Sequence, residues 1–234
     1  MIVFVCYSWE TFFYYIFWIN ALKMEIYVIR HGETEYNVGA VRFRGRKDIP
    51  LSELGIKHAE ETGEVLANVP IEAIYYSKLS RTRVTAEKIK EYHPKAIFEE
   101  EPYLLDMSFG DWEGKTFDEI FIGEEKEKWF SNPHDFIIPN GETFYAVLDR
   151  IHRLFKRLER QKEKIVVFVT HGAVINLIFV YITRTHPSNF WRFYPKPSSI
   201  SKIVYENGLF YICLLYTSPS PRDLSTSRMP SSAW

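Results

Sequence analysis

Cysteine is nearly absent from this sequence, and neither sign of charge is in excess. Cys6 and Cys213 are the two cysteines among 234 residues and lie near opposite ends, which excludes a disulfide framework or a cysteine-rich metal site and favours a reducing compartment. Lysine and arginine number 29 against 30 aspartates and glutamates, so the basic excess typical of nucleic-acid binding is missing. We expect a cytoplasmic protein without a nucleic-acid partner.

Glycine is missing from both ends of the chain. All 11 glycines fall between residues 24 and 212, whereas residues 1–23 are rich in aromatic side chains and residues 217–234 in serine, threonine and proline. We expect one folded domain over 24–212, an apolar extension over 1–23, and a disordered tail over 213–234. The tail resembles translated adapter DNA, so it is predicted to be an artefact.

An uninterrupted apolar run long enough for a membrane span is also lacking. Residues 2–22 have the required length, but Glu10 interrupts them. A signal peptide requires a basic residue before its apolar run, and none precedes this one. Met24 stands directly before a strand-like pattern, so residues 1–23 are interpreted as spurious upstream sequence, with a membrane anchor as the alternative. A membrane partner is expected only if they are an anchor.

Short apolar runs alternate with helical patterns through residues 24–212. The runs 25–29, 71–76 and 165–169 predict strands of a parallel sheet covered on both faces. Ser52 is expected to cap a helix whose buried stripe includes Ile56, Ala59 and Leu66. An amphipathic helix is expected over about 143–162, and Asn207-Gly208 predicts a hairpin. This order favours an α/β fold, a three-layer α/β/α sandwich with a mostly parallel sheet and its ligand site at the carboxyl ends of the strands.

Two predicted strands end in a histidine followed by glycine, namely at 30–32 and 170–172. Glycine at these points is expected to let the backbone approach a bound group. Residues 30–37 and 170–172, with ordered blocks at 45–55, 77–82, 109–114 and 140–143, resemble the histidine phosphatase superfamily, which includes the cofactor-dependent phosphoglycerate mutases. The resemblance implies a phosphoglycerate mutase-like fold and phosphomonoester hydrolysis through a phosphohistidine.

The side chains suit that chemistry. A phosphate monoester carries nearly two negative charges, so a nucleophile reaches phosphorus only where fixed cations hold its oxygens. Arg30 and Arg81 supply bidentate donors, and neutral imidazole is nucleophilic near pH 7. By resemblance, His31 is the nucleophile, His171 donates to the phosphoryl oxygens, and Asn37 contacts phosphate. A backbone carbonyl is expected to select the tautomer of His31.

Two positions depart from the family pattern. Asp106 stands three residues before a Phe-Gly pair, where the phosphatase branch usually has a glutamate that protonates the leaving oxygen. We expect Asp106 to be this acid, with Glu113 as the alternative and otherwise a structural hydrogen-bonding residue. Arg44 replaces a common glutamine. It either adds positive charge at the pocket rim, favouring a more anionic substrate, or is a solvated surface residue.

Residues 102–142 are predicted to form a cap that sets substrate choice. The aromatic residues at 190–194 either line a pocket or pack in the core, and core packing is the preferred interpretation. The sequence contains no HExxH pair and no carboxylate cluster with ligand spacing, so we expect no metal and no cofactor. The other histidines are expected to be structural or exposed.

Together these observations predict a metal-independent phosphomonoesterase that acts on a small phosphorylated metabolite. Two alternatives stay open. A cofactor-dependent phosphoglycerate mutase retains the phosphoryl group instead of releasing it, and a non-catalytic phosphate-binding protein performs no transfer. The natural substrate and the oligomeric state are left open by the sequence.

Overall fold

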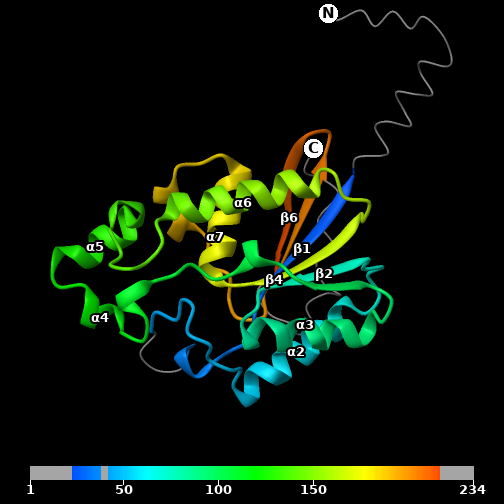
Figure 1. Cartoon of the computed structure of the whole chain (residues 1–234), viewed down its shortest axis with the longest axis horizontal. Coiled ribbons are helices and arrows are strands. Elements are labelled where there is room, and N and C mark those ends of the chain that lie inside the picture. The colour runs from blue at the N-terminus through cyan, green and yellow to red at the C-terminus, as the bar shows by residue number, and fades with distance from the viewer. Residues whose placement is uncertain (1–22, 38–41, 217–234) are drawn as a thin grey trace, which may run out of the picture.

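A six-stranded sheet forms the centre of the computed structural model, which describes residues 23–37 and 42–216 (Figure 1). The strand order is β3-β2-β4-β1-β5-β6. Four strands are parallel, namely β1 (Met24–Arg30), β2 (Ala73–Tyr76), β3 (Ile97–Glu100) and β4 (Ile165–Thr170). The strands β5 (Ile200–Glu206) and β6 (Leu209–Tyr216) extend this sheet by antiparallel pairing. The predicted mostly parallel sheet is therefore confirmed.

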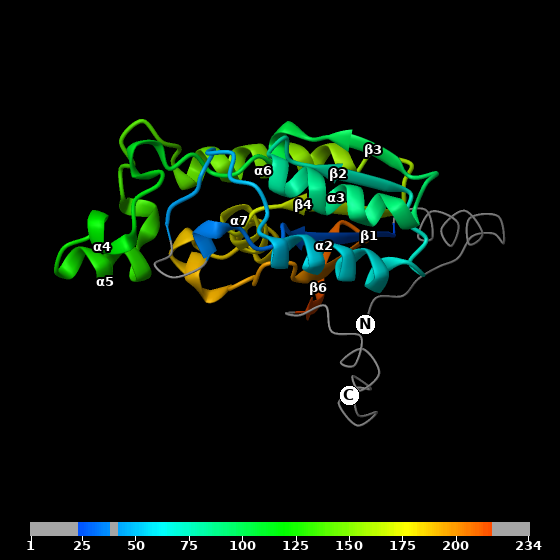
Figure 2. The same cartoon turned by 90° about the horizontal axis from the view of Figure 1, so that it is seen from below.

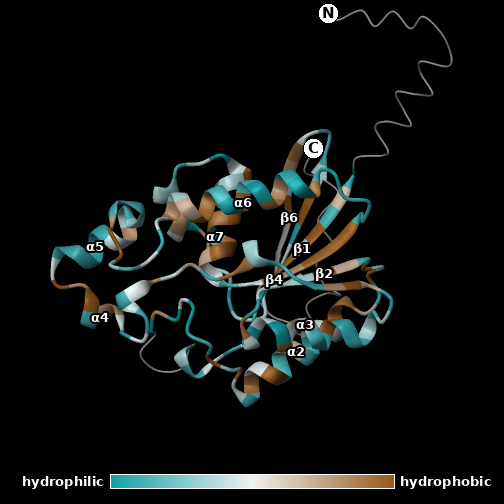
Figure 3. Ribbon diagram, viewed as in Figure 1, coloured by the Kyte–Doolittle hydropathy of each residue, from teal (hydrophilic) through white to brown (hydrophobic). Residues whose placement is uncertain are grey.

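Helices cover both faces of the sheet, which confirms the predicted three-layer sandwich (Figure 2). α2 (Glu53–Leu66) and α3 (Ser80–Tyr92) lie on one face, and α6 (Phe144–Leu158) and α7 (Gly172–Thr183) on the other. Alternate residues of β1 join opposite cores, Val28 on the α6 and α7 side and Ile29 on the α2 and α3 side. Burial on both faces explains why the strand sequences are continuously apolar (Figure 3).

The predicted helix signals agree with the structure apart from two details. The Ser52 side chain caps α2 by accepting a hydrogen bond from the Gly55 N–H at 3.0 Å. Ile56, expected on the buried stripe of α2, is 39% exposed. The amphipathic helix α6 buries most of its predicted apolar stripe but ends at Leu158 instead of near 162.

The Asn207-Gly208 hairpin is confirmed, because these two residues connect β5 and β6 with φ values of 53° and 80°. Positive φ at both central residues is the geometry of the type I′ turn. The predicted domain limit at 212 falls inside β6, which pairs with β5 as far as Tyr216 opposite Ile200. Residues 213–216 therefore belong to the sheet instead of a disordered tail, since backbone pairing with β5 does not depend on the composition that suggested disorder.

The rest of the predictions for the two ends, over 1–22 and 217–234, lie outside the described residues. Within the part of the chain that is described, no helix is both long and apolar enough to cross a membrane.

Short elements extend the molecule beyond one end of the sheet. α4 (Phe117–Ile120) and α5 (Glu124–Ser131) lie at the left in Figure 1, with the 3₁₀ turn η3 (Gly110–Trp112) before them in the chain and η4 (Pro133–Asp135) after them. The turn η5 (Pro187–Arg192) packs against α5, and the Trp191 Nε1–H donates to the Trp129 carbonyl at 2.9 Å. Aromatic side chains fill this region and join it to the core beside α6 and α7.

Candidate active site

Parallel pairing of β1 with β4 brings the two predicted histidines together. Arg30 at the end of β1 stands opposite Thr170 at the end of β4, and the His31 N–H donates to the Thr170 carbonyl at 3.0 Å. Both histidines leave the sheet at this edge, and their ring centroids are 5.3 Å apart. Each is fully buried. Residues 140 positions apart in the sequence thus share one site because neighbouring strands carry them.

The His31 ring is held in one tautomer, as the sequence predicts. Its Nδ1 lies 2.6 Å from the Gly32 carbonyl oxygen. A carbonyl only accepts hydrogen bonds, so Nδ1 carries the proton and Nε2 carries the lone pair. Nε2 is buried and has no hydrogen-bond partner among the described residues. The ring therefore presents an unshared nucleophilic nitrogen.

His171, Arg81 and Asp106 form a buried network beside His31. Arg81 Nε donates to His171 Nδ1 at 3.3 Å, and His171 Nε2 lies 2.9 Å from Ser77 Oγ. Nδ1 therefore accepts and Nε2 donates, which makes the ring neutral. Arg81 Nη2 donates to Asp106 Oδ2 at 3.2 Å, and the same oxygen lies 3.5 Å from His171 Nδ1. Ser77 is a member of this network that the sequence argument did not single out.

Backbone carbonyls hold the Arg81 guanidinium in place. Its Nη1 donates to the Lys47 carbonyl and its Nη2 to the Gly45 carbonyl, each at 2.8 Å. Gly45 has a φ of +52°, and a Cβ there would lie 2.0 Å from Glu113 Oε1. A bulkier residue at position 45 would displace the loop that orients Arg81.

Arg30, Asn37 and Arg44 line the cavity next to these histidines. Arg30 donates from Nη1 to the Pro195 carbonyl at 2.7 Å, while its Nε has no partner among the described residues. The Asn37 Oδ1 accepts from both the N–H and the Oγ1 of Thr34, at 3.0 and 3.1 Å, so its amide nitrogen is left for the cavity. Arg44 Nη1 donates to Thr34 Oγ1 at 3.3 Å. Arg44 therefore lies in the pocket wall, and the alternative of a solvated surface residue is wrong.

Burial and positive charge shift the pKa values of the site in directions that suit acid-base work. Burial lowers the pKa of His31 well below 6.5, and Arg81, Arg44 and Arg30 lower it further. Burial also lowers the pKa of His171, and the charge of Arg81 lowers it further. Burial raises the pKa of Asp106 above its ordinary value, although Arg81 and Arg44 oppose this. Burial thus favours the neutral form of both imidazoles, and it makes Asp106 a weaker acid than an exposed carboxyl group.

Glu113 has a structural environment. Its carboxylate accepts hydrogen bonds from the N–H groups of Arg46, Lys47 and Phe109, at 2.9, 3.2 and 3.1 Å. These bonds tie the loop that carries Arg81's carbonyl partners to the segment that carries Asp106. Glu113 is absent from the pocket lining, whereas Asp106 is part of it.

The glycines after the two histidines serve purposes that the sequence argument did not identify. A Cβ on Gly32 would lie 2.4 Å from the Gly55 carbonyl oxygen, so this glycine allows the loop after β1 to pack on the start of α2. A Cβ on Gly172 would lie 3.3 Å from Arg30 Cζ.

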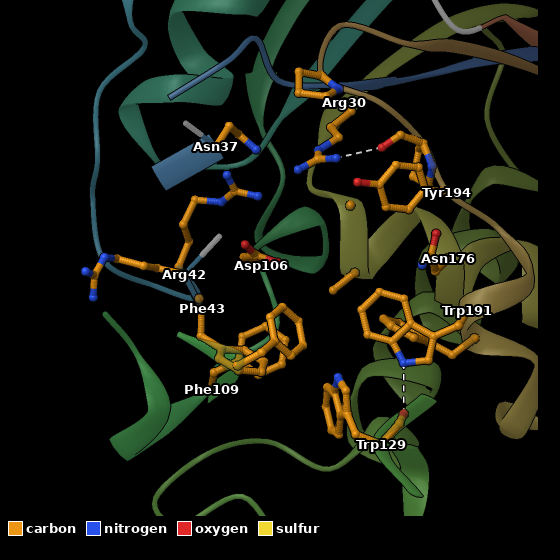
Figure 4. A pocket seen from close by; sticks show the side chains of 18 of the residues that line it. Arg30, Asn37, Arg42, Phe43, Asp106, Phe109, Trp129, Asn176, Trp191 and Tyr194 are labelled. Atoms are coloured by element: carbon orange, nitrogen blue, oxygen red, sulfur yellow. Dashed lines mark hydrogen bonds between the residues drawn. The ribbon is translucent and has the colours of Figure 1, made fainter. Parts of the chain in front are cut away.

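The cavity measures about 490 Å³ and has two chemically different ends (Figure 4). Figure 4 shows Arg30 and Asn37 on one side, Asp106 in the middle, and Phe43, Phe109 and Trp129 on the opposite side. The predicted cap segment 102–142 contributes lining residues at 106, 109, 117, 129 and 130.

The aromatic residues at 190–194 divide between pocket and core. Trp191 and Tyr194 line the cavity, contrary to the preferred interpretation of core packing. Phe193 does pack in the core, 5.1 Å from Phe179 between ring centroids. The 3₁₀ turn η5 ends at Arg192 and the chain is extended at Phe193, so these side chains lie in different surroundings, which composition does not reveal. Over the described ranges, no group of three or more histidines, cysteines or carboxylates is placed to hold a metal ion.

Comparison with known proteins defines the class to which this histidine and arginine site belongs. The model for the histidine phosphatase superfamily (branch 1) matches residues 26–222. The chain therefore belongs to the histidine phosphatase superfamily, as its sequence motifs predict.

The relatives within this superfamily include several phosphatases. The adenosylcobalamin/alpha-ribazole phosphatase of Salmonella typhimurium is 30% identical over 175 residues, which cover 73% of this chain and 85% of that protein. Phosphoserine phosphatase 1 of Hydrogenobacter thermophilus is 28% identical over 187 residues, covering 78% and 87%. The structure of Bacillus stearothermophilus YhfR is 31% identical, with a TM-score of 0.74 and coverage of 82% and 96%. The chain is a phosphomonoester hydrolase with a phosphoglycerate mutase-like fold.

Proposed function

We propose that this hydrolase removes phosphate from small phosphomonoesters by transferring the phosphoryl group first to Nε2 of His31 and then to water. The observation that carries the proposal is the unpartnered Nε2 lone pair, buried beside the pocket and surrounded by the guanidinium groups of Arg30, Arg44 and Arg81. A cavity of about 490 Å³ suits a small-molecule ester.

In the first step, Nε2 of His31 attacks phosphorus and the bond to the ester oxygen breaks. Arg30, Arg44 and Asn37 bind the phosphoryl oxygens, and charge-assisted bonds of this kind are the strong ones. Arg81 and His171, which lie beside His31, stabilise the negative charge of the transferring group. Asp106 gives its proton to the leaving oxygen, which departs as an alcohol.

In the second step, water attacks the phosphohistidine. The Asp106 carboxylate, left without its proton by the first step, accepts a proton from the attacking water. The bond between phosphorus and Nε2 breaks and inorganic phosphate leaves. Asp106 is then protonated and His31 neutral, so both residues are ready for the next substrate. The approach of the phosphate dianion raises the pKa of Asp106 further, because a like charge favours the neutral acid.

Release of inorganic phosphate from p-nitrophenyl phosphate, measured with EDTA present, tests the activity. We expect turnover that EDTA does not change. We also expect rapid-quench labelling to trap a covalent phosphohistidine at His31, recognised by its lability in acid. Activity that EDTA abolishes would contradict the mechanism. Labelling that persists in His31→Ala would assign the nucleophile to another residue.

The mutase alternative is tested with the same protein. A phosphoglycerate mutase interconverts 2- and 3-phosphoglycerate, whereas a hydrolase releases phosphate from either. We expect phosphate release to exceed interconversion, and the reverse would replace the hydrolase proposal. The non-catalytic alternative requires inorganic phosphate binding with no turnover of any ester.

A further inference from the structure

The cavity contains a polar atom that the proposed chemistry does not use. Asn176 lies on α7, whose sequence GAVINLIFVYIT is otherwise almost entirely apolar. Its side chain lines the cavity and is 4% exposed. The Oδ1 atom has no hydrogen-bond partner within the described part of the chain. A buried acceptor without a partner destabilises the folded state, so its presence in the pocket wall calls for a functional reason.

Aromatic rings surround the same end of the cavity. Phe117 of α4, Phe130 of α5 and Trp191 of η5 form what we call the aromatic mouth. The ring centroids of Phe117 and Phe130 are 6.0 Å apart with planes 20° apart, and Phe130 is 5.3 Å from Trp191. Phe130 is 47% exposed although it is a large apolar side chain. Three rings from three separate elements thus meet at an opening.

The single polar atom of the aromatic mouth is already occupied. Trp191 Nε1–H donates to the Trp129 carbonyl, so the indole offers the pocket an apolar ring surface. Figure 4 shows Asn176 on the side of the cavity that carries Trp191 and Tyr194, away from Asn37. Asn176 Oδ1 is therefore the acceptor that an apolar wall places within reach of a bound molecule.

The position of Asp106 sets which part of a substrate meets this wall. Asp106 lies between the cationic end and the aromatic end of the cavity (Figure 4). An acid that protonates the leaving oxygen must lie where the phosphoryl group ends and the alcohol begins. With the phosphoryl group at Arg30 and His31, the alcohol extends past Asp106 toward the aromatic mouth.

We propose that the aromatic mouth and Asn176 form a leaving-group subsite that selects phosphate esters of alcohols carrying a flat ring with a hydrogen-bond donor. The ring packs against the side of the aromatic mouth that Phe130 and Trp191 form, and the donor gives its hydrogen bond to Asn176 Oδ1. This inference rests on the proposed function, and it adds the chemical class of the alcohol. Small hydrophilic esters are bound by the phosphate end alone and are turned over less efficiently.

Four esters of primary alcohols with similar leaving-group pKa test the subsite. They are propyl phosphate, 2-phenylethyl phosphate, and the 3- and 4-hydroxy forms of 2-phenylethyl phosphate. We expect kcat/KM to rise about fivefold to tenfold from propyl to phenylethyl, as ring stacking predicts. At least one hydroxy isomer should gain a further factor of about five from the added hydrogen bond.

Two variants separate the two parts of the subsite. Phe130→Ala is expected to remove most of the fivefold to tenfold excess of kcat/KM for phenylethyl phosphate over kcat/KM for propyl phosphate. Ile122→Ala is the matched control, because this 79% exposed residue of the same segment is not part of the pocket lining. Asn176→Leu is expected to keep the advantage of the ring and lose that of the hydroxyl group.

Thermal unfolding gives an independent readout for Asn176. Asn176→Leu removes an unpartnered buried acceptor at nearly constant volume, so the midpoint temperature should rise by about 2–6 °C. A fall in the midpoint would show that Asn176 has a structural role and would contradict the inference. Equal kcat/KM for propyl and phenylethyl phosphate in the parent protein would also overturn it, whereas failure to hydrolyse any of the esters or p-nitrophenyl phosphate would contradict the proposed function itself.

Discussion

The two ends of the active-site cavity are constructed in different ways. At the phosphate end, the key side chains follow strand ends or are held by backbone carbonyls, as His31 is by Gly32 and Arg81 by Gly45 and Lys47. At the aromatic end, Phe117, Phe130 and Trp191 belong to short helices and a 3₁₀ turn beyond the sheet. Short elements are supported mainly by side-chain packing, which tolerates substitution better than strand pairing does.

This difference separates what the chemistry requires from what the substrate requires. Nucleophile, acid and cations must be held within a fraction of an ångström of their productive positions. Ring stacking tolerates displacement, because dispersion and apolar burial have little directional preference. We therefore expect variants at the phosphate end to change the rate for every ester and variants at the aromatic end to change the ranking of esters.

The largest effect is expected for His31→Ala. Removal of the nucleophile should lower kcat for p-nitrophenyl phosphate by about 10⁴-fold or more, on the scale of nucleophile deletions in other enzymes. Steady-state kinetics and phosphohistidine labelling measure it. His58→Ala on α2 is the matched histidine control and should retain full activity. If both variants were equally active, the phosphate end would not contain the nucleophile.

Asp106→Asn should distinguish esters by their leaving group. For alkyl phosphates we expect a loss of about 10²–10³-fold, because the alcohol needs a proton, and for p-nitrophenyl phosphate a loss of only about tenfold. The ratio of kcat/KM values for the two esters is the measurement. Glu113→Gln is the carboxylate control, and it should alter thermal stability while leaving that ratio unchanged. Equal losses on both esters would argue against proton donation by Asp106.

Arg44→Gln should have a smaller effect. It introduces the residue that is common in the family and removes one cation from a site where the charges of Arg30, Arg44 and Arg81 act on Asp106. The inhibition constant of inorganic phosphate is expected to rise about tenfold or less. Arg83→Gln, an exposed residue of α3 paired with Glu87, is the arginine control. An unchanged inhibition constant would show that Arg44 does not bind the dianion.

The smallest effect concerns stability against pH. The pKa of His31 is lowered by burial, so the folded state binds fewer protons than the unfolded state, whose histidine titrates near 6.5. The stability from this group is present above pH 6.5 and is lost as pH falls toward the lowered pKa, by at most about 1.4 kcal/mol per pH unit. Denaturant unfolding of the parent protein and His31→Gln between pH 8 and 5.5 measures the difference.

The pKa shift of Asp106 changes stability with pH in the opposite direction. Its raised pKa contributes stability at low pH that is lost as pH rises through the folded value. The parent protein and His31→Gln both contain Asp106, so the difference between their free energies of unfolding reports on His31. A pH-independent difference would contradict the buried neutral imidazole.

Individual residues show which structural features sequence patterns can predict. Ser52 was identifiable as a cap and Asn207-Gly208 as a turn, because both depend on local hydrogen bonds and φ values. Ile56 was not identifiable as exposed, since its burial depends on where α3 stops covering α2. The packing of Gly32 against Gly55 was likewise not identifiable, because Gly55 lies on a different element.

Asn176 and Trp191 gave no sequence signal of their place in the pocket. An asparagine in an apolar helix and a tryptophan in an aromatic stretch are compatible with either a core or a pocket, and only the packing of α4, α5 and η5 decides between them. The strand ends are different. Once two parallel strands are predicted, the rule that their carboxyl ends meet already places His31 near His171.

The order of residues along the chain by itself determined the sheet-forming segments, the helix cap, the hairpin and the superfamily, because these follow from periodicity, local hydrogen bonding and contiguous motifs. Tertiary structure alone decided which carboxylate faces the pocket, that Arg44 lines it, and which aromatic rings surround its opening. These outcomes depend on the packing of segments distant in sequence, and no local interaction specifies that packing.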